Sequence, residues 1–344
     1  MSISLHIDDI IYRLQRTGGI SVYWQEMTSR IAKDPAFTIR HSRGSKATRM
    51  LPIISRGDLF HSSYFRTPLS VKTKIVVTVY DFLYELGWLS TKGGLVTIWQ
   101  KKQAIRAADV IICISEQTKR DLLAIYPDVS KYADIHVVYL GKSFSIDHPA
   151  SRQKCQRFVT LQNIIPDRYV LFVGGRSGYK NFTGAATGFA RSSLPQQGFS
   201  IVCTGTRFTD SEMALLNTLG LQDRAIALDQ ATYDELNYLY QHAFALVYPS
   251  LYEGFGLPPL EAMSCGCPVI VSNTSSLPEV VGNAGILIDP SDPVFICDAL
   301  ERLCDRTTRL VCKEKGVARS KLFDWDITAE KHIEVYKSLV PTDL

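Results

Sequence analysis

The sequence contains no long apolar run. No stretch of the 344 residues approaches the roughly 20 apolar residues needed to span a bilayer. The N-terminus lacks the basic start and apolar core of a signal peptide, so a cytoplasmic protein is expected. With 46% hydrophobic and 21% charged residues, the composition is that of a globular protein. The length exceeds what one core usually covers, which predicts two domains.

The eight cysteines form no disulfide framework and no zinc pattern. Cys265 and Cys267 make one Cys-x-Cys pair, but no second pair stands at a suitable spacing. Two small buried thiols are the simpler interpretation. No Asp-x-Asp motif follows a predicted strand, so we expect no metal site.

The charge is unevenly distributed along the chain. Residues 1–150 carry 20 lysines and arginines against 13 acids, whereas the remainder carries 18 against 21. Most of the basic excess lies within residues 40–74: Arg40, Arg43, Lys46, Arg49, Arg56, Arg66, Lys72 and Lys74, against the single acid Asp58. Such a segment suits phosphates, an anionic membrane surface or nucleic acid, and equally a solvated basic loop.

Short apolar runs alternate with longer amphipathic segments. After an opening strand and one that ends near residue 60, strands are predicted at residues 74–80, 109–115, 169–174, 199–205, 243–248 and 267–272. Helices are predicted at residues 20–31, 94–107, 116–125, 211–219, 232–241 and 327–339. This alternation is typical of parallel sheets covered by helices on both faces.

Two such sets are present, and the polar residues 141–157 are interpreted as the linker. The predicted domains are residues 1–150 and 160–326, both Rossmann-like. Ligands of such sheets bind beyond the C-terminal ends of the strands. The expected site is therefore a cleft between the two domains.

Two glycine pairs stand where phosphates could bind. Gly18 and Gly19 precede a predicted helix, whose N-terminus favours anions, although a plain tight turn fits as well. Residues 174–175 are also glycines and follow a predicted strand. Arg176 and Lys180 come next, four residues apart, and both are expected to point at one diphosphate.

Residues 253–261 form the most informative segment. Its sequence, Glu-Gly-Phe-Gly-Leu-Pro-Pro-Leu-Glu, places two acids around a glycine-rich turn. Pro258 and Pro259 suit the first turn of a helix that is expected to stop at Gly266. Glu253 and Glu261 are thus placed to meet different hydroxyls of one ligand.

Two further candidates lie in the N-terminal half. Asp81 follows Tyr80 at a strand end and can face the cleft or cap a helix. His61 follows another strand end, where a satisfied loop histidine is an equally good interpretation.

Together these segments resemble the retaining glycosyltransferases of family 4, whose two Rossmann-like domains face a central cleft in the GT-B arrangement. The resemblance covers nearly the whole chain and is most specific at Glu253-x7-Glu261. The other matching positions are Gly18-Gly19, Ser115-Glu116, Gly141, Gly175-Arg176, Lys180-Asn181, Gly266, Pro268, Leu277-Pro-Glu279 and Phe323-Asp-Trp325. It also implies that the final helix, residues 327–340, packs back on the N-terminal domain, which would bind the acceptor.

The resemblance implies roles for the matching residues. Arg176 and Lys180 would bind the donor diphosphate, Glu261 the ribose hydroxyls and Glu253 the transferred sugar. Asp81 would orient the acceptor, whereas Tyr80 stands where the family often has a histidine. Gly18 and Gly19 would lie under the phosphates or the acceptor, and the remaining donor-side residues are expected to be Thr204, Asp229, Phe255, Gly256 and Leu257.

The expected reaction is transfer of a hexose with retention of configuration and without a metal or other cofactor. The form of the phosphate motif is similar to bacterial polysaccharide mannosyltransferases, which implies GDP-mannose as donor. UDP- and dTDP-sugars remain open. The basic segment would suit a polyprenyl-diphosphate-linked glycan acceptor at the inner membrane face.

Two other classes remain for comparison. A phosphorylase or nucleotide-sugar epimerase can share the fold, but phosphorylases are longer and the epimerases' additional cleft acids are not found. A nucleic-acid-binding module would explain the basic segment but not the two glutamates, so no nucleic acid is expected.

Overall fold

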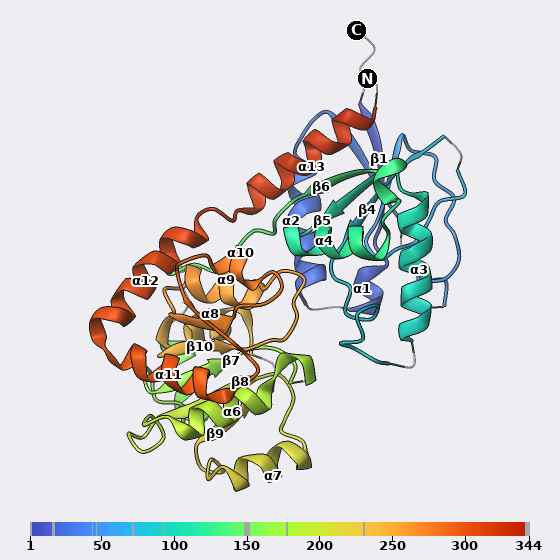
Figure 1. The fold of residues 1–344 in the computed structure, drawn as a ribbon. Helices are drawn as coiled ribbons and strands as arrows, with labels where there is room; N and C mark the ends of the chain where they lie inside the picture. The colour runs from blue at the N-terminus through green and yellow to red at the C-terminus, as the bar shows by residue number, and fades with distance from the viewer. Residues whose placement is uncertain are drawn as a thin grey trace. The chain divides into compact units, whose positions relative to one another are not determined.

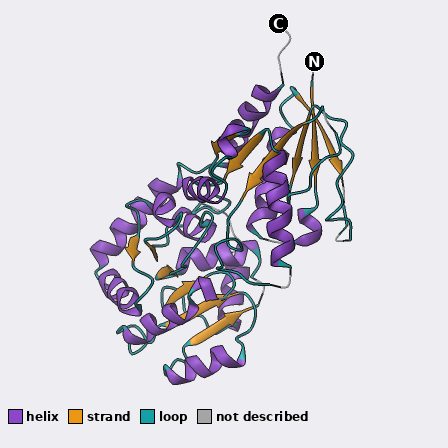
Figure 2. Cartoon of the chain, turned by 45° about the vertical axis from the view of Figure 1, so that its right-hand side comes forward, coloured by secondary structure: helices purple, strands orange, loops and turns teal. Residues whose placement is uncertain are grey.

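The structure is a computed structural model that describes residues 2–15, 18–42, 44–45, 47–70, 72–91, 93–147, 152–176, 178–229 and 231–340. The chain divides into two compact units. Residues 1–141 and 323–344 form unit 1, and residues 142–322 form unit 2. In each unit the strands lie inside and the helices outside, as the two views in Figure 1 and Figure 2 show.

Unit 1 is built on a six-stranded parallel sheet with the strand order β2-β1-β3-β4-β5-β6. Its strands are β1 (Ile3–Asp8), β2 (Phe37–Ser42), β3 (Leu59–Ser62), β4 (Lys74–Val79), β5 (Val110–Cys113) and β6 (Asp134–Val137). Its helices are α1 (Ile11–Leu14), α2 (Gly19–Ile31), α3 (Gly94–Ala107), α4 (Glu116–Ile125), the 3-10 turn η1 (Val129–Lys131) and α13 (Trp325–Leu339).

Unit 2 repeats the plan with the order β12-β11-β10-β7-β8-β9. Its strands are β7 (Tyr169–Phe172), β8 (Ser200–Thr204), β9 (Ala225–Leu228), β10 (Ala245–Tyr248), β11 (Val269–Ser272) and β12 (Ile286–Ile288). Its helices are α5 (Arg152–Leu161), η2 (Gly178–Lys180), α6 (Phe182–Arg191), α7 (Asp210–Thr218), α8 (Tyr233–His242), α9 (Leu257–Ser264), α10 (Leu277–Val281), α11 (Pro293–Cys304) and α12 (Arg306–Ser320).

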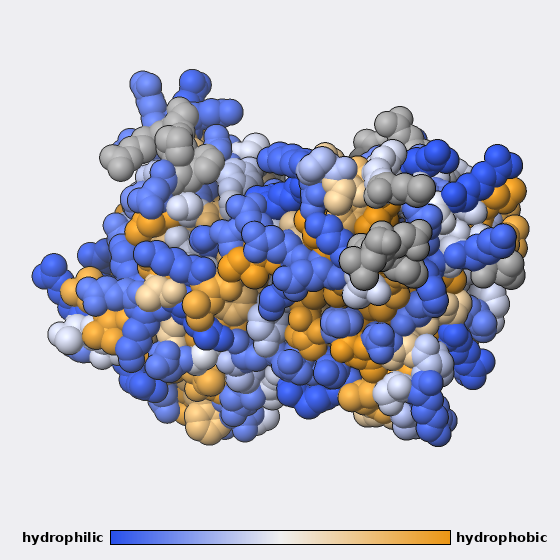
Figure 3. Space-filling view, turned by 90° about the horizontal axis from the view of Figure 1, so that it is seen from above, coloured by the Kyte–Doolittle hydropathy of each residue, from blue (hydrophilic) through white to orange (hydrophobic). Residues whose placement is uncertain are grey.

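The inner strands are apolar because helices cover both faces of each sheet. Every residue of β3, β5, β7, β10 and β11 is buried. The helices begin at local capping signals: Ser115 accepts a hydrogen bond from the Thr118 N–H, and Thr209 and Thr232 each form a capping box with the glutamate three residues later. The face drawn in Figure 3 is mixed, with small apolar groups set among polar side chains.

The last helix, α13, packs against α2 in unit 1 (Figure 1). The Tyr23 hydroxyl lies 2.6 Å from Nε2 of His332, and the Tyr336 hydroxyl lies 2.7 Å from Nδ1 of His61. Gly141 makes room for the helix start, since a Cβ there would lie 2.3 Å from the Trp325 nitrogen. The two matching positions at Gly141 and Trp325 are therefore explained by one close contact.

The expected linker at residues 141–157 is wrong in its second half. Helix α5 starts at Arg152 and turns Cys155 and Val159 into the protein interior, four residues apart on one face. Among the described residues before it, the Ile146 N–H donates to the Ser264 carbonyl. This part of the chain is therefore packed structure that belongs to unit 2.

Candidate functional site

Lys180 and Glu253 form the central contact of unit 2. Lys180 ends the turn η2 after β7, and Glu253 lies in the loop after β10, two neighbouring strands of the sheet. The Lys180 Nζ lies 2.5 Å from the Glu253 carboxylate and 2.7 Å from the Tyr248 hydroxyl. The two charged side chains are 14% and 12% exposed, so the pair lies at the surface edge of the site and not deep in the core.

The loop of residues 253–256 is held in one conformation. The Ser276 hydroxyl contacts the backbone carbonyls of Glu253 and Phe255, at 2.9 and 2.8 Å. Gly256 has a φ of +106°, and a Cβ there would come within 2.7 Å of Leu277. Helix α9 then begins at Leu257 with proline in its first turn, as expected. The start of a fixed helix presents backbone N–H groups to an anion or a hydroxyl.

Glu261 lies on α9, in a largely apolar setting. Its carboxylate accepts a hydrogen bond from the Tyr240 hydroxyl at 2.9 Å. Burial raises the pKa of Glu261 to about 7, and the bond from Tyr240 only partly opposes this shift. A carboxyl group with a pKa near neutrality changes its charge within the physiological range, which makes it sensitive to a bound ligand.

Arg176 does not share a contact with Lys180. Its guanidinium donates to Glu212 at 2.8 and 3.2 Å and to the carbonyls of Thr206 and Arg207 at 2.8 Å. The side chain is 4% exposed and lies over the Phe208 ring. The two cations that were expected to point at one diphosphate are thus each paired with a different acid. A role for Arg176 at the donor stays a prediction that requires it to release Glu212.

The pairing of Arg176 was not visible in the sequence. Glu212 is the last residue of the Thr-x-x-Glu capping box at the start of α7, and this pattern signals only a helix start. A cavity of about 590 Å³ adjoins the contact and is lined by Arg176, Thr206, Ser211 and Glu212 among others.

The other donor-side candidates of unit 2 lie at strand ends. Thr204 is the last residue of β8, and its hydroxyl accepts from the Gly174 N–H at 3.3 Å. Asp229 follows β9 and is exposed. Because β7, β8 and β9 are parallel neighbours, these ends lie along one edge of the sheet, where ligands of such folds bind.

In unit 1, Gly18 and Gly19 open helix α2. Gly18 has a φ of +149°, and a Cβ there would lie 2.1 Å from the Gln15 side chain. Gly19 is the first residue of the helix, so its N–H is one of those without a partner inside the helix. The expected glycine-rich helix start is therefore present.

Tyr80 and Asp81, which follow β4, lie in different environments. Tyr80 is buried, and its hydroxyl accepts from Trp24 Nε1 at 2.6 Å and donates to the Ser63 carbonyl at 3.2 Å. Burial raises the pKa of Tyr80 well above its usual value. Tyr80 is therefore a core residue in this structure. The Asp81 carboxylate accepts from the Leu83 N–H at 3.2 Å and lines a cavity.

His61 is also a core residue. Both ring nitrogens have partners, the Tyr336 and Thr78 hydroxyls at 2.7 and 2.9 Å, and burial lowers the pKa of His61 well below its ordinary value. The interpretation of a satisfied histidine holds, but it lies in strand β3 and not in a loop.

The basic segment of residues 40–74 does not form one charged surface. Arg66 is buried and pairs with Asp8 at 3.0 Å, and Lys74 pairs with Asp109 at 2.7 Å. Arg49 hydrogen-bonds to Gln100 and Thr97. Arg40, Arg56 and Lys72 are exposed, whereas Arg43 and Lys46 lie outside the described residues. Arg66 is therefore a structural residue, which neither an anion-binding patch nor a solvated loop predicts.

Cys265 and Cys267 are free, buried thiols. Within the described part of the chain, no group of three or more histidine, cysteine or acidic side chains is arranged to hold a metal ion.

Comparison with known proteins gives relatives for most of the chain. It is 32% identical over 244 residues to the O-antigen chain mannosyltransferase B of Escherichia coli, which covers 69% of this chain and 62% of that protein. It is 31% identical over 245 residues to the serotype-specific mannosyltransferase WbdA of Escherichia coli, which covers 68% of this chain and 29% of that protein. The chain thus spans less than two thirds of the length of either relative.

The fold has solved counterparts. The HepE protein of Anabaena, determined in complex with UDP and glucose, matches 98% of this chain and 100% of its own with a TM-score of 0.75 at 15% identity. This likeness confirms the expected class of two Rossmann-like parallel-sheet domains. Residues 162–317 match the sequence family described as glycosyl transferases group 1. These residues lie in unit 2 and make up less than half of the chain.

Proposed function

We propose that the chain is a retaining glycosyltransferase that moves mannose from GDP-mannose to a glycan acceptor. The observation that carries the proposal is the contact between Lys180 and Glu253 at the fixed loop before α9. Glu261 lies on α9 itself. A cation, a carboxylate and a helix start at the end of a parallel sheet match the phosphates and hydroxyls of a nucleotide sugar.

Each of these groups has a separate task. Lys180 and the α9 N-terminus hold the diphosphate, Glu253 accepts hydroxyl hydrogens of the hexose, and Glu261 accepts those of the ribose. Because Lys180 already contacts Glu253, a phosphate that replaces part of this contact keeps the ammonium paired throughout. The phosphate thus takes the place of Glu253 at the ammonium, and the Glu253 carboxylate becomes available to the hexose hydroxyls.

The chemical step breaks the bond between the sugar's anomeric carbon and the diphosphate oxygen. The acceptor hydroxyl attacks from the same face, and a diphosphate oxygen takes its proton. Lys180 and the helix N-terminus stabilise the negative charge that develops on the leaving group. Asp81, in unit 1, orients the acceptor. We propose that this step proceeds without a metal ion or other cofactor.

The choice of mannose as the donor sugar is supported by the two Escherichia coli relatives, both named as mannosyltransferases. A thermal-shift screen of the chain with GDP, UDP, dTDP and their sugars tests the choice of GDP-mannose. We expect a rise in melting temperature of a few degrees with GDP and GDP-mannose, because a ligand that binds only the folded state stabilises it. A shift with UDP or dTDP alone would identify that nucleotide as the donor in place of GDP. No shift with any of them would contradict the proposal.

We further propose that the acceptor is linked through a diphosphate to a polyprenyl lipid, and that unit 1 contacts the anionic membrane that holds it. Among the described residues, none of the helices is both long and apolar enough to cross a bilayer. Exposed apolar side chains do occur on α3 and the segment before it: Leu86, Trp88, Leu95, Val96 and Trp99. Leu95, which is 82% exposed, and Trp99 are four residues apart and share one helix face.

Sedimentation with anionic vesicles tests this contact. The wild-type chain is expected to sediment with phosphatidylglycerol vesicles, and Leu95→Glu/Trp99→Glu to remain largely in the supernatant because it places charge in the lipid interface. Leu310→Glu, at an exposed position of unit 2, is the matched control. Equal sedimentation of all three proteins would refute the contact.

A further inference from the structure

A cavity of about 280 Å³ lies in unit 1, beyond the ends of β3 and β4. It is close in size to the smaller small-molecule pockets of proteins. The tyrosine rings of Tyr64 and Tyr84 line it, together with Asp81, Thr97 and the guanidinium-bearing side chain of Arg49. Aromatic faces beside a few polar groups are suited to a sugar ring, which has an apolar face and a rim of hydroxyls.

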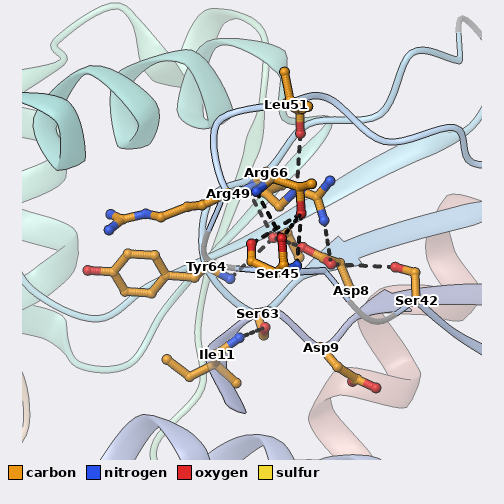
Figure 4. Close-up of polar contacts among 12 residues, drawn as sticks. Asp8, Asp9, Ile11, Ser42, Ser45, Arg49, Leu51, Ser63, Tyr64 and Arg66 are labelled. Carbon is orange, nitrogen blue, oxygen red and sulfur yellow. Dashed lines mark hydrogen bonds and ion pairs between the residues drawn. The ribbon is translucent and has the colours of Figure 1, made fainter. Parts of the chain in front are cut away.

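Arg49 is held in place before any ligand binds. Its Nε donates to Gln100 Oε1 and its Nη2 to Thr97 Oγ1, both at 3.0 Å, while Gln100 Nε2 donates to the Arg49 carbonyl at 2.9 Å. The guanidinium carbon lies 4.9 Å from the centre of the Tyr64 ring. Figure 4 shows the Arg49 and Tyr64 side chains extending in the same direction, away from the Asp8–Arg66 contact.

The charge of Arg49 lacks a counterpart in the described structure. Its two side-chain hydrogen bonds go to a neutral amide and a neutral hydroxyl, and Nη1 donates to no described residue. The other buried or partly buried cations near the two sites each contact a carboxylate: Arg66 with Asp8, Lys101 with Glu85, Arg176 with Glu212 and Lys180 with Glu253. A positioned guanidinium with free donors matches the geometry of an oxyanion that takes two parallel hydrogen bonds.

The other cation at the cavity, Lys101, is already neutralised. It is 3% exposed, and its Nζ contacts Glu85 at 3.0 Å and the Asp81 carbonyl at 2.7 Å. Lys101 therefore fixes the backbone of Asp81 and leaves recognition of an anion to Arg49. Burial raises the pKa of Tyr64 to about 12, so its hydroxyl stays neutral beside the guanidinium.

We propose that this cavity binds the acceptor sugar together with a phosphate attached to its ring, and that Arg49 selects for that phosphate. The sugar ring lies against Tyr64 and Tyr84, one hydroxyl donates to Asp81, and the phosphate takes hydrogen bonds from Arg49. The inference rests on the proposed function and adds to it the residue that recognises the phosphate next to the acceptor sugar. A sugar carboxylate would offer a similar oxyanion, and the experiment separates the two sources.

The test is an NMR titration of the full chain with hexose 1-phosphates, the matching methyl glycosides and methyl glucuronoside. Saturating GDP is present so that the donor site is filled. The wild type is expected to bind a hexose 1-phosphate at least about tenfold more tightly than its glycoside, the usual effect of a charge-assisted hydrogen bond. Arg49→Ala should bind the phosphate and the glycoside equally, and Arg49→Lys should fall between.

Arg56→Ala is the control, since Arg56 is an exposed cation of the same basic segment outside the cavity. It should bind like the wild type, and all variants should keep their melting temperature. The proposal is overturned if no 1-phosphate is preferred by the wild type, if Arg49→Ala and Arg49→Lys keep the preference, or if the glucuronoside binds as tightly as the phosphates. GDP binding, measured in the same samples, tests the proposed function separately. If GDP does not bind, the wild type and the Arg49 variants can still be compared for their affinity for the sugar phosphates.

Discussion

Unit 1 and unit 2 place ion pairs at the same position of the same architecture, but the pairs differ in exposure. In unit 1, Asp8 ends β1 and Arg66 lies in the loop after β3, with side chains 0% and 6% exposed. In unit 2, Lys180 and Glu253 also lie near strand ends, at 14% and 12%. A sealed pair can only hold the fold together, because no ligand reaches it. A pair at the open edge can exchange one partner for a ligand.

The difference extends to how well each unit could be recognised. Residues 162–317, which lie in unit 2, match the family, and the motif around Glu253 and Glu261 predicts its charged site. In unit 1 the segment that was predicted to attract anions contains one buried structural arginine, Arg66, and one arginine in a cavity, Arg49. Neither placement follows from spacing along the chain.

The largest expected effect concerns the open pair. Lys180→Ala and Glu253→Ala should each lower the transfer rate by about 10²-fold or more, since each removes a group that stabilises charge or holds the donor in the transition state. Because both side chains are partly exposed, the melting temperatures should change little. Steady-state rates with GDP-mannose and thermal melts measure both. A variant that melts far below the wild type would show that this pair stabilises the fold, as the Arg66–Asp8 pair of unit 1 is expected to do.

The sealed pair is expected to show the opposite behaviour. Arg66→Met leaves the buried Asp8 carboxylate without its cation, with only the Ser42 and Ser62 hydroxyls as partners, and should lower the free energy of unfolding of unit 1 by about 3 kcal/mol. Burial raises the pKa of Asp8 even with Arg66 beside it, so the penalty for losing the arginine is large. Urea unfolding of the full chain measures it. Asp8→Asn/Arg66→Met should recover part of the lost stability. An unchanged urea midpoint in Arg66→Met would show that the Arg66–Asp8 pair does not stabilise the fold more than the open pair does.

A smaller effect should appear in the pH dependence of GDP binding. The pKa of Glu261 is raised to about 7, so the group is mostly protonated at pH 6 and mostly ionised at pH 8. Ribose hydroxyls donate to the ionised form, so affinity should rise over this range by up to about tenfold. Glu261→Gln should lose that part of the slope. The terminal phosphate of GDP titrates in both proteins and cancels in the comparison. Identical slopes would show that Glu261 does not contact the ribose.

The strands show what local sequence can and cannot predict. Every inner strand of both sheets was predicted, most of them from the continuous apolar run that a strand covered by helices on both faces requires. The missed strands are the edges: β2, β6, β9 and β12. β2 and β6 alternate between partly buried and exposed residues along most of their length, so they do not stand out from loops. Their existence depends on a neighbour that is distant in sequence.

The candidate site was predicted in the same uneven way. The glycine-rich turn and the helix with Pro258 and Pro259 in its first turn follow from residue types and were predicted. The partner of Arg176 was not, because Glu212 is 36 residues away and local spacing contains no information on that contact.

The most direct test of the central claim, that the open pair of unit 2 binds a nucleotide sugar with Lys180 on its diphosphate, is calorimetric titration of GDP-mannose into the full chain and into Lys180→Ala. We predict saturable binding to the wild type, weakened by about tenfold or more in the variant, in keeping with the loss of a charge-assisted contact to phosphate. Equal affinity of the two proteins would contradict the account.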